Sequence, residues 1–184
     1  MGDPDGVIRL KRPTRIMTVQ AAADFLKPYS SRNREHVIVL HATPLLDVFA
    51  EQICAVGTMT SVGFEMHDVF RAAILMDTKA IIIAHNHPYE DHIVRSIKDT
   101  ILTKDLIEAG RVLRTHVLDH IILGPKQFWS YRKNGEGGFD KTEDYTESLG
   151  GFGATYIRAG HKISNTFVLD IKKEEPKKKR RRKK

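Results

Sequence analysis

Apolar residues along the first 135 positions of the chain follow two different periods. Short unbroken runs rich in β-branched residues predict buried strands at residues 35–40 and 79–84. Apolar residues three and four positions apart predict helices at residues 18–27, 66–77 and 96–109. Residues 44–56 fit neither period, although a further strand is expected near them.

Capping and helix-breaking residues predict where these helices end. Thr18 is a suitable N-cap for the first helix, and Pro28 is expected to end it. Gly110 is the expected C-cap of the third helix, whose inward side is expected to carry Ile97, Ile101, Leu102 and Leu106. Two short strands are then expected at 111–118 and 120–123, and three aromatic residues are expected to close the core: Phe128, Trp129 and Tyr131.

The order of these elements indicates an α/β fold, with a mixed β-sheet flanked by helices. The 184 residues suffice for one domain with a substantial core. Residues 1–17 are polar and interrupted by prolines, and we expect them to form a flexible leader before a single domain at 18–135. Residues 136–171 have weak periodicity and are expected to form a weakly structured extension.

The positive charge of the chain is concentrated at its C-terminal end. Residues 172–184 hold ten Lys/Arg and two Glu, a net charge of +8, which leaves −1 of the total +7 for the other 171 residues. Such a run is expected to be a disordered tail. It can be a solubility tail, a nuclear-import signal, an added tag or a nucleic-acid anchor that releases counterions.

The single cysteine, Cys54, excludes several classes of protein. One thiol forms no internal disulfide, so a reducing, cytoplasmic compartment is expected. It also excludes structural zinc sites with two or more thiolates, and the zinc deaminases that need Cys-x-x-Cys. No apolar run approaches the roughly 20 residues that cross a bilayer, and the N-terminus lacks the apolar core of a signal peptide. We therefore expect no membrane contact, and we make no prediction of oligomeric state.

Residues with metal-binding chemistry follow the strand predicted at 79–84. His85 and His87 lie two positions apart, so both project from the same face of a strand end. Asp99 falls in the first turn of the next helix, where it can approach that end. Two imidazoles and one carboxylate are a zinc ligand set that keeps one position open for water. Ser96 and Asp99 also suit the start of a helix, and capping is compatible with metal binding.

At these positions the chain resembles the JAMM (MPN-plus) zinc metalloproteases. Their motif of His-x-His-Pro, seven residues and Ser-x-x-Asp is matched by His85, His87, Pro88, Ser96 and Asp99, and their upstream glutamate is matched by Glu35. Within this superfamily the chain is most similar to the RadC-like branch. The similarity covers roughly residues 19–135 and includes Gly57-Thr-Met-Thr-Ser, Ala84-His-Asn-His-Pro and Leu118-Asp-His-Ile-Ile-Leu-Gly.

The resemblance implies a JAB/MPN architecture, related to that of cytidine deaminases, and a zinc-dependent metallopeptidase or isopeptidase acting on a protein or peptide. His85, His87 and Asp99 would hold one Zn²⁺ per chain. Glu35 would accept a proton from the attacking water and deliver it to the leaving amine. Ser96 would donate a hydrogen bond to the oxyanion.

Several residues near this motif have two interpretations. Tyr89-Glu90-Asp91-His92 replaces the Ser-Gly-Asp-Pro that is usual in RadC-like proteins, a difference that concerns substrate choice more than metal binding. His92 is either a bystander or a substrate contact. Asp119 and His120 match a family string and either pack structurally or orient a ligand from behind. Without the resemblance, Glu35 would be an ordinary charge at a strand edge.

The RadC resemblance also carries an association with DNA repair, which favours nucleic-acid binding by the tail. The alternative function is therefore a DNA-associated accessory protein with a structural or vestigial metal site. The tail could also direct the protein to a nucleoid or nucleus. The candidate nucleic-acid-binding residues are Lys177, Lys178, Lys179, Arg180, Arg181, Arg182, Lys183 and Lys184.

Overall fold

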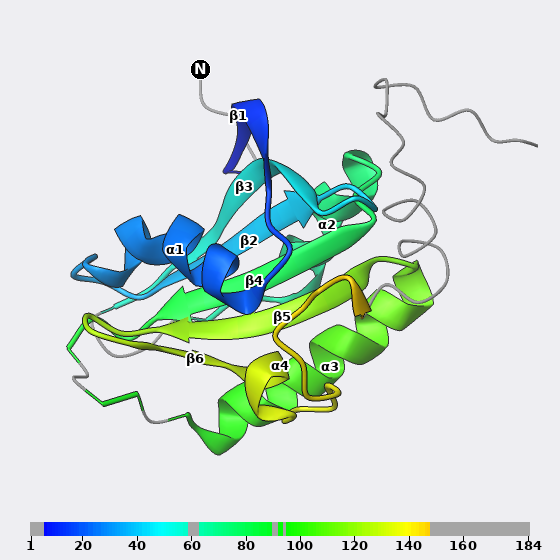
Figure 1. Ribbon diagram of the computed structural model, residues 1–184. Helices are drawn as coiled ribbons and strands as arrows, with labels where there is room; N and C mark the ends of the chain where they lie inside the picture. The colour runs from blue at the N-terminus through cyan, green and yellow to red at the C-terminus, as the bar shows by residue number, and fades with distance from the viewer. Residues whose placement is uncertain (1–5, 59–62, 90–91, 94, 148–184) are drawn as a thin grey trace, which may run out of the picture.

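The computed structural model describes residues 6–58, 63–89, 92–93 and 95–147. Six strands and four helices lie within these ranges (Figure 1). In chain order they are β1 (Val7–Arg15), α1 (Val19–Ser30), β2 (His36–Ala42), β3 (Asp47–Val56), α2 (Met66–Leu75), β4 (Ala80–Asn86), α3 (Ile97–Leu113), β5 (His116–Leu123), β6 (Phe128–Ser130) and α4 (Tyr131–Asn134).

The six strands form one mixed sheet in the order β1-β3-β2-β4-β5-β6. All neighbouring strands are antiparallel except β4 and β5, which are parallel. Parallel neighbours need a crossover connection, and α3 provides it here. A single domain with a mixed sheet flanked by helices confirms the predicted fold class.

Helices cover both faces of the sheet, which explains the unbroken apolar run of β4. Helix α1 packs on one face, and α2 and α3 pack on the other (Figure 1). Ile82 and Ala84 point into the core beneath α1, whereas Ile81 and Ile83 point into the core beneath α2 and α3. A strand buried on both faces shows no alternation of apolar and polar residues.

The expectation of a flexible leader is wrong for residues 7–15. They form β1, an edge strand that pairs with β3 from Val7↔Gln52 to Arg15↔Asp47. Arg15 Nε and Nη2 each donate to an Asp47 carboxylate oxygen at 2.8 Å. Most β1 side chains are exposed, so the strand shows no apolar pattern in the sequence.

Helix α1 runs past Pro28 to Ser30, so the predicted end before Pro28 is also wrong. Thr18 caps the helix as predicted, because its hydroxyl accepts from the Ala21 amide at 3.2 Å. Pro28 lies in the last turn and removes only one backbone hydrogen bond there. The carbonyl that would have accepted this bond belongs to Asp24, an exposed residue that water can reach.

Helix α3 continues through Gly110 to Leu113, so Gly110 is not its C-cap. The cap is Arg114, which adopts the left-handed conformation at φ 55°. Gly110 instead permits a close approach, because a Cβ there would lie 2.5 Å from the Thr115 carbonyl oxygen. A side chain at this position would collide with the backbone that leads into β5.

The segment after α3 forms one strand, β5, where two short strands were predicted. Residues 111–113 of the first predicted strand belong to α3 instead. Of the three aromatic residues expected to close the core, Tyr131 is fully buried, and Phe128 and Trp129 are partly buried.

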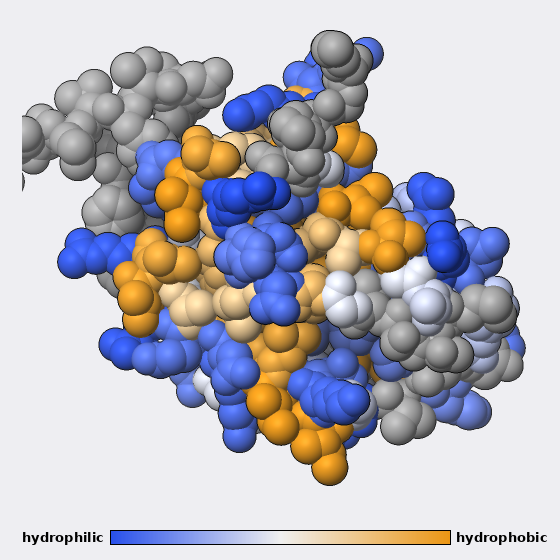
Figure 2. Space-filling model, turned by 180° about the vertical axis from the view of Figure 1, so that it is seen from behind, coloured by the Kyte–Doolittle hydropathy of each residue, from blue (hydrophilic) through white to orange (hydrophobic). Residues whose placement is uncertain are grey.

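Two of the four apolar residues assigned to the inward side of α3 lie outside, whereas Leu102 is partly buried against the core. Ile97 is 81% exposed and Ile101 is 54% exposed, whereas Leu106 is buried. Apolar side chains gather on the surface seen from behind in Figure 2. Near the start of α3 the inward positions hold the polar residues Asp99 and Thr103, so the apolar period predicts the wrong face where the site is built.

Part of the expected extension at 136–171 packs on the domain. Phe139 and Tyr145 are buried, and Thr18 and Asp144 form an antiparallel bridge. Residues 148–171 and the tail at 172–184 lie outside the described residues. None of the helices described here has the length and apolarity needed to cross a membrane.

Candidate metal centre

The end of β4 directs alternate side chains to opposite faces of the sheet. His85 follows Ile81 and Ile83 on the face covered by α2 and α3, and His87 lies two residues further on. Asn86 between them lies on the α1 face. Both histidines therefore face the start of α3, as their spacing predicted.

Asp99 is held in the first turn of α3 by a capping box. The Ser96 hydroxyl accepts from the Asp99 amide at 3.0 Å, and Asp99 Oδ2 accepts from the Ser96 amide and hydroxyl, each at 2.8 Å. These bonds orient the carboxylate so that Oδ2 serves the cap and Oδ1 lies toward His85. The cap therefore uses one carboxylate oxygen, Oδ2, and leaves Oδ1 available as a metal ligand.

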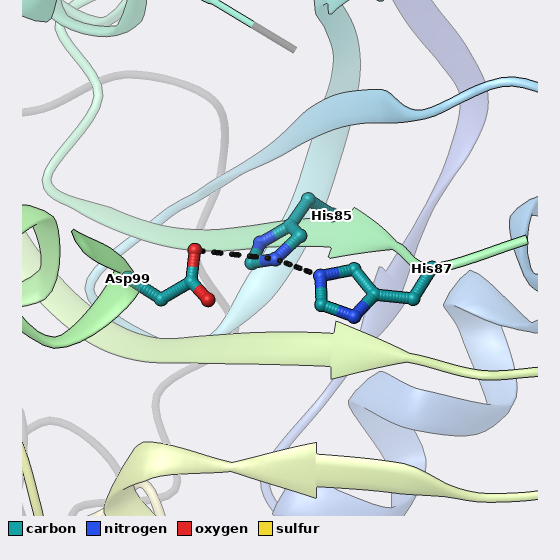
Figure 3. A group of neighbouring side chains, drawn as sticks. All are labelled: His85, His87 and Asp99. Atoms are coloured by element: carbon teal, nitrogen blue, oxygen red, sulfur yellow. Dashed lines mark hydrogen bonds and ion pairs between the residues drawn. The ribbon is translucent and has the colours of Figure 1, made fainter. Parts of the chain in front are cut away.

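Three potential ligand atoms meet at this point, from His85, His87 and Asp99, all within 4.8 Å of one another. Figure 3 shows His85 between the other two residues. His85 Nε2 lies 3.1 Å from His87 Nε2 and 3.7 Å from Asp99 Oδ1. Ligands of a tetrahedral zinc ion, each at its usual bond length, are separated by about 3.4 Å. The donor set and its spacing therefore fit a zinc ion.

A chain of hydrogen bonds behind the ligands determines which His85 nitrogen faces the cluster. Thr103 Oγ1 donates to the Asp99 carbonyl at 2.6 Å and therefore accepts from His120 Nδ1, also at 2.6 Å. His120 Nε2 is then an acceptor, and His85 Nδ1 donates to it at 2.9 Å. The lone pair of His85 consequently lies on Nε2, the nitrogen that points toward His87 and Asp99.

This series of hydrogen bonds requires a neutral His120, and its position in the core favours that form. The ring stacks on Tyr131 with centroids 5.2 Å apart and planes at 8°. Complete burial lowers the pKa of His120 well below its ordinary value. Of the two roles left open by the sequence, the contacts of His120 are those of a residue that orients a ligand.

Asp119 has a structural role beside His120. Its carboxylate accepts from the backbone amides of His120 and Arg132 at 2.8 and 3.0 Å, and from the hydroxyls of Ser130 and Tyr145 at 2.6 and 3.0 Å. Burial raises the pKa of Asp119 to about 6. The carboxylate joins β5 to α4 and to the segment that carries Tyr145, and so fixes the strand that presents His120.

Glu35 immediately precedes β2 and is 9% exposed. Val37 pairs with His85 in the antiparallel β2–β4 ladder. Moving two residues along each strand from this pair places Glu35 on the same side of the sheet as His87. The Glu35 backbone is held by Thr58 and Gly57, since its amide donates to the Thr58 carbonyl at 2.9 Å and its carbonyl accepts from the Gly57 amide at 2.8 Å.

Among the residues that the structure describes, no further histidine joins the group formed by His85, His87 and Asp99. His41 is buried with Nδ1 3.2 Å from Thr78 Oγ1 and Nε2 3.2 Å from Gln52 Oε1, and burial lowers its pKa to about 4. His92 is exposed in the loop before α3. The candidate nucleic-acid-binding residues 177–184 lie outside the described residues.

Two residues of this site were not predicted from the sequence. Thr103 lies four residues after Asp99, a spacing that places both on one helix face. This spacing is the feature of the sequence from which Thr103 could have been assigned to the site. Asn86 stands between the two histidines, where strand alternation turns it to the other face. Its contacts involve residues 32–36, which are about 50 positions away and could not be inferred from local spacing.

The comparisons with known proteins agree with the fold. A family model described as the RadC-like JAB domain matches residues 16–136. The chain belongs to this family.

Its relatives include proteins named "UPF0758 protein" from several bacteria. The Staphylococcus carnosus protein is 37% identical over 127 residues, which cover 68% of this chain and 56% of that protein. The Chlorobium chlorochromatii protein is 29% identical over 125 residues, covering 66% and 56%. The Desulforamulus reducens protein is 37% identical over 103 residues, covering 56% and 45%. The chain thus spans about half the length of the curated relatives it matches.

Thr103→Val is expected to weaken zinc binding by about 10-fold, because it removes the hydroxyl that fixes His120 and preserves the shape of the side chain. Competition with a chromophoric zinc chelator measures the dissociation constant. Thr115→Val is the matched control, since it removes a buried hydroxyl that donates to a backbone carbonyl near the other end of α3. Equal zinc affinity in the Thr103 variant and wild type would contradict a ligand-orienting role.

Proposed function

We propose that this protein is a zinc-dependent metallopeptidase or isopeptidase that hydrolyses a peptide or isopeptide bond. The observation that carries this proposal is the meeting of His85, His87 and Asp99, with hydrogen bonds that orient His85 Nε2 and Asp99 Oδ1 toward one point. Family membership supports the same conclusion.

The two imidazole nitrogens and Asp99 Oδ1 would hold the zinc ion. When bound, zinc would supply a Lewis acid that polarises the scissile carbonyl and makes a coordinated water acidic near neutral pH. Two neutral histidines and one carboxylate leave the site with net positive charge. Three protein ligands also leave a position for substrate or water, as in catalytic rather than structural zinc sites.

Glu35 and Ser96 would carry out the proton transfer and the oxyanion contact. Glu35 would take a proton from the attacking water and pass it to the leaving amine, a role for which a carboxylate on the His87 side of the sheet is suited. The Ser96 hydroxyl, at the exposed start of α3, would donate to the oxyanion. In this structure that hydroxyl donates to Asp99 Oδ2. To donate to the oxyanion of the substrate, it would have to give up this hydrogen bond.

The test is cleavage of a library of peptides and isopeptide-linked peptides by the zinc-loaded protein, followed by mass spectrometry. Cleavage products that disappear when a chelator removes the metal would support the proposal. The Glu35 variant described in the Discussion separates catalysis from metal binding in the same assay. A zinc-loaded wild type that cleaves no member of the library would count against peptidase activity.

A second candidate function rests on the charge of residues 172–184. Their net charge is +8, whereas the other 171 residues together carry −1. In this alternative the protein is a DNA-associated accessory protein that binds nucleic acid through its tail. Removal of the tail is expected to abolish retention on DNA at moderate salt, because each phosphate contact contributes about −0.9 to the slope of log K against log salt. Filter binding across a salt series measures this, and unchanged retention of the truncated protein would require a DNA site in the body.

A further inference from the structure

Asn86 is fully buried between the two candidate histidine ligands, and all three of its side-chain hydrogen bonds reach one segment of backbone. Its Oδ1 accepts from the His36 amide at 2.7 Å. Its Nδ2 donates to the carbonyls of Arg34 at 3.1 Å and Arg32 at 3.3 Å. The side chain of Asn86 is thus hydrogen-bonded to the backbone on both sides of Glu35.

The sheet geometry explains why a side chain makes these contacts. The β2–β4 ladder ends at the pair Val37↔His85. Beyond that pair, β4 keeps only its other neighbour, β5, with which it pairs along its whole length as far as Asn86↔Leu123, and the His87 amide donates to the Leu123 carbonyl at 2.8 Å. The side-chain amide of Asn86 therefore connects the segment before β2 to the end of β4, beyond the last backbone pair of the β2–β4 ladder.

Because side chains alternate along a strand, the consecutive residues 85–87 face opposite sides of the sheet. His85 and His87 face Asp99 on one side of the sheet, and Asn86 faces the Glu35 segment from the other side. Because Asn86 has both histidines as chain neighbours, the position of the Glu35 backbone is coupled directly to the position of the ligands.

We propose that Asn86 is a positioning residue, which holds Glu35 at the correct distance from the His85–His87–Asp99 site by fixing the peptide units before and after it. This inference rests on the proposed function and deepens it, because it assigns the placement of the proton-transfer group to a residue that touches neither metal nor substrate. A displacement of about 1 Å in such a group can cost about 100-fold in rate.

Two variants test the proposal. Asn86→Asp keeps the size of the side chain and an acceptor for the His36 amide, but replaces both donations to carbonyls with repulsion. Asn86→Ala removes all three bonds, and either variant suffices if the other does not fold. The control is Asn134→Ala, which removes one asparagine-to-backbone hydrogen bond, to the Ser130 carbonyl, at the end of α4.

The main measurement needs no substrate. Protein labelled with ¹³C-glutamate is loaded with Co²⁺, and the cobalt-induced shift and broadening of the Glu35 carboxyl carbon are compared with the zinc-loaded protein. The signal is assigned by its absence in Glu35→Gln. We expect a large cobalt effect in wild type and Asn134→Ala, loss of most of it in both Asn86 variants, and an unchanged metal content of about one ion per chain.

Kinetics on a peptide found by the library screen provide the second readout. The Asn86 variants are expected to lower kcat by about 100-fold with KM unchanged. A cobalt effect on Glu35 that is equal in wild type and the Asn86 variants would overturn the positioning role alone. A wild type that binds cobalt but whose Glu35 carbon does not respond to it would overturn the positioning role together with the proton-transfer role of Glu35, and would leave the metal site standing. A wild type that binds no metal would overturn the proposed function, and the positioning role with it.

Discussion

Replacing His87 by alanine is expected to reduce the zinc content from about one ion per chain to almost none. The substitution removes one of three protein ligands, and the remaining histidine and carboxylate form an incomplete site. His87 is the best ligand to replace, because its side chain is only partly buried at the strand end. His85 is buried against His120, so its loss would also disturb the core.

Elemental mass spectrometry on protein purified without metal-affinity resin measures this effect. Zinc should also raise the free energy of unfolding of wild type, by about 2.7 kcal/mol at a free concentration 100 times the dissociation constant, and should not stabilise the variant. His116→Ala is the matched control, since His116 is exposed at the start of β5. One zinc ion per chain retained in His87→Ala would place the metal elsewhere and remove the basis of the proposed function.

Glu35→Gln is expected to leave zinc content unchanged and to reduce hydrolysis by about 10²- to 10⁴-fold, the usual contribution of general acid–base catalysis. Glutamine has the shape of glutamate but cannot accept the proton from the attacking water. The backbone bonds of this residue to Gly57 and Thr58 do not depend on its side chain, so the fold should persist.

The measurement compares initial rates on a cleaved library peptide, alongside zinc content. Glu108→Gln makes the same chemical change at an exposed carboxylate paired with Arg111 on α3, and its rate should equal that of wild type. Full activity in Glu35→Gln would mean that another group transfers the proton. Loss of zinc together with activity would instead assign Glu35 to metal binding.

The sequence predicted the parts of the fold in which a local period and a buried surface coincide. β4 and its neighbour β2 are short apolar runs buried on both faces, and α2 buries Val69 and Ala73, which are four positions apart and so at helical spacing. The prediction failed for β1, whose exposed side chains follow no apolar period because it is an edge strand held by backbone bonds. It also failed at the start of α3, where polar Asp99 and Thr103 face inward and Ile97 faces outward.

The sequence by itself determined the candidate ligand set, because His85 and His87 at strand spacing and Asp99 in the first turn of a helix are local features. Only the tertiary structure decided how these ligands are oriented. The His120–Thr103 chain that orients His85, and the Asn86 bonds around Glu35, join positions 17 to 54 residues apart. Such contacts depend on how β2, β4, β5 and α3 pack together, and local spacing in the sequence carries no information about that packing.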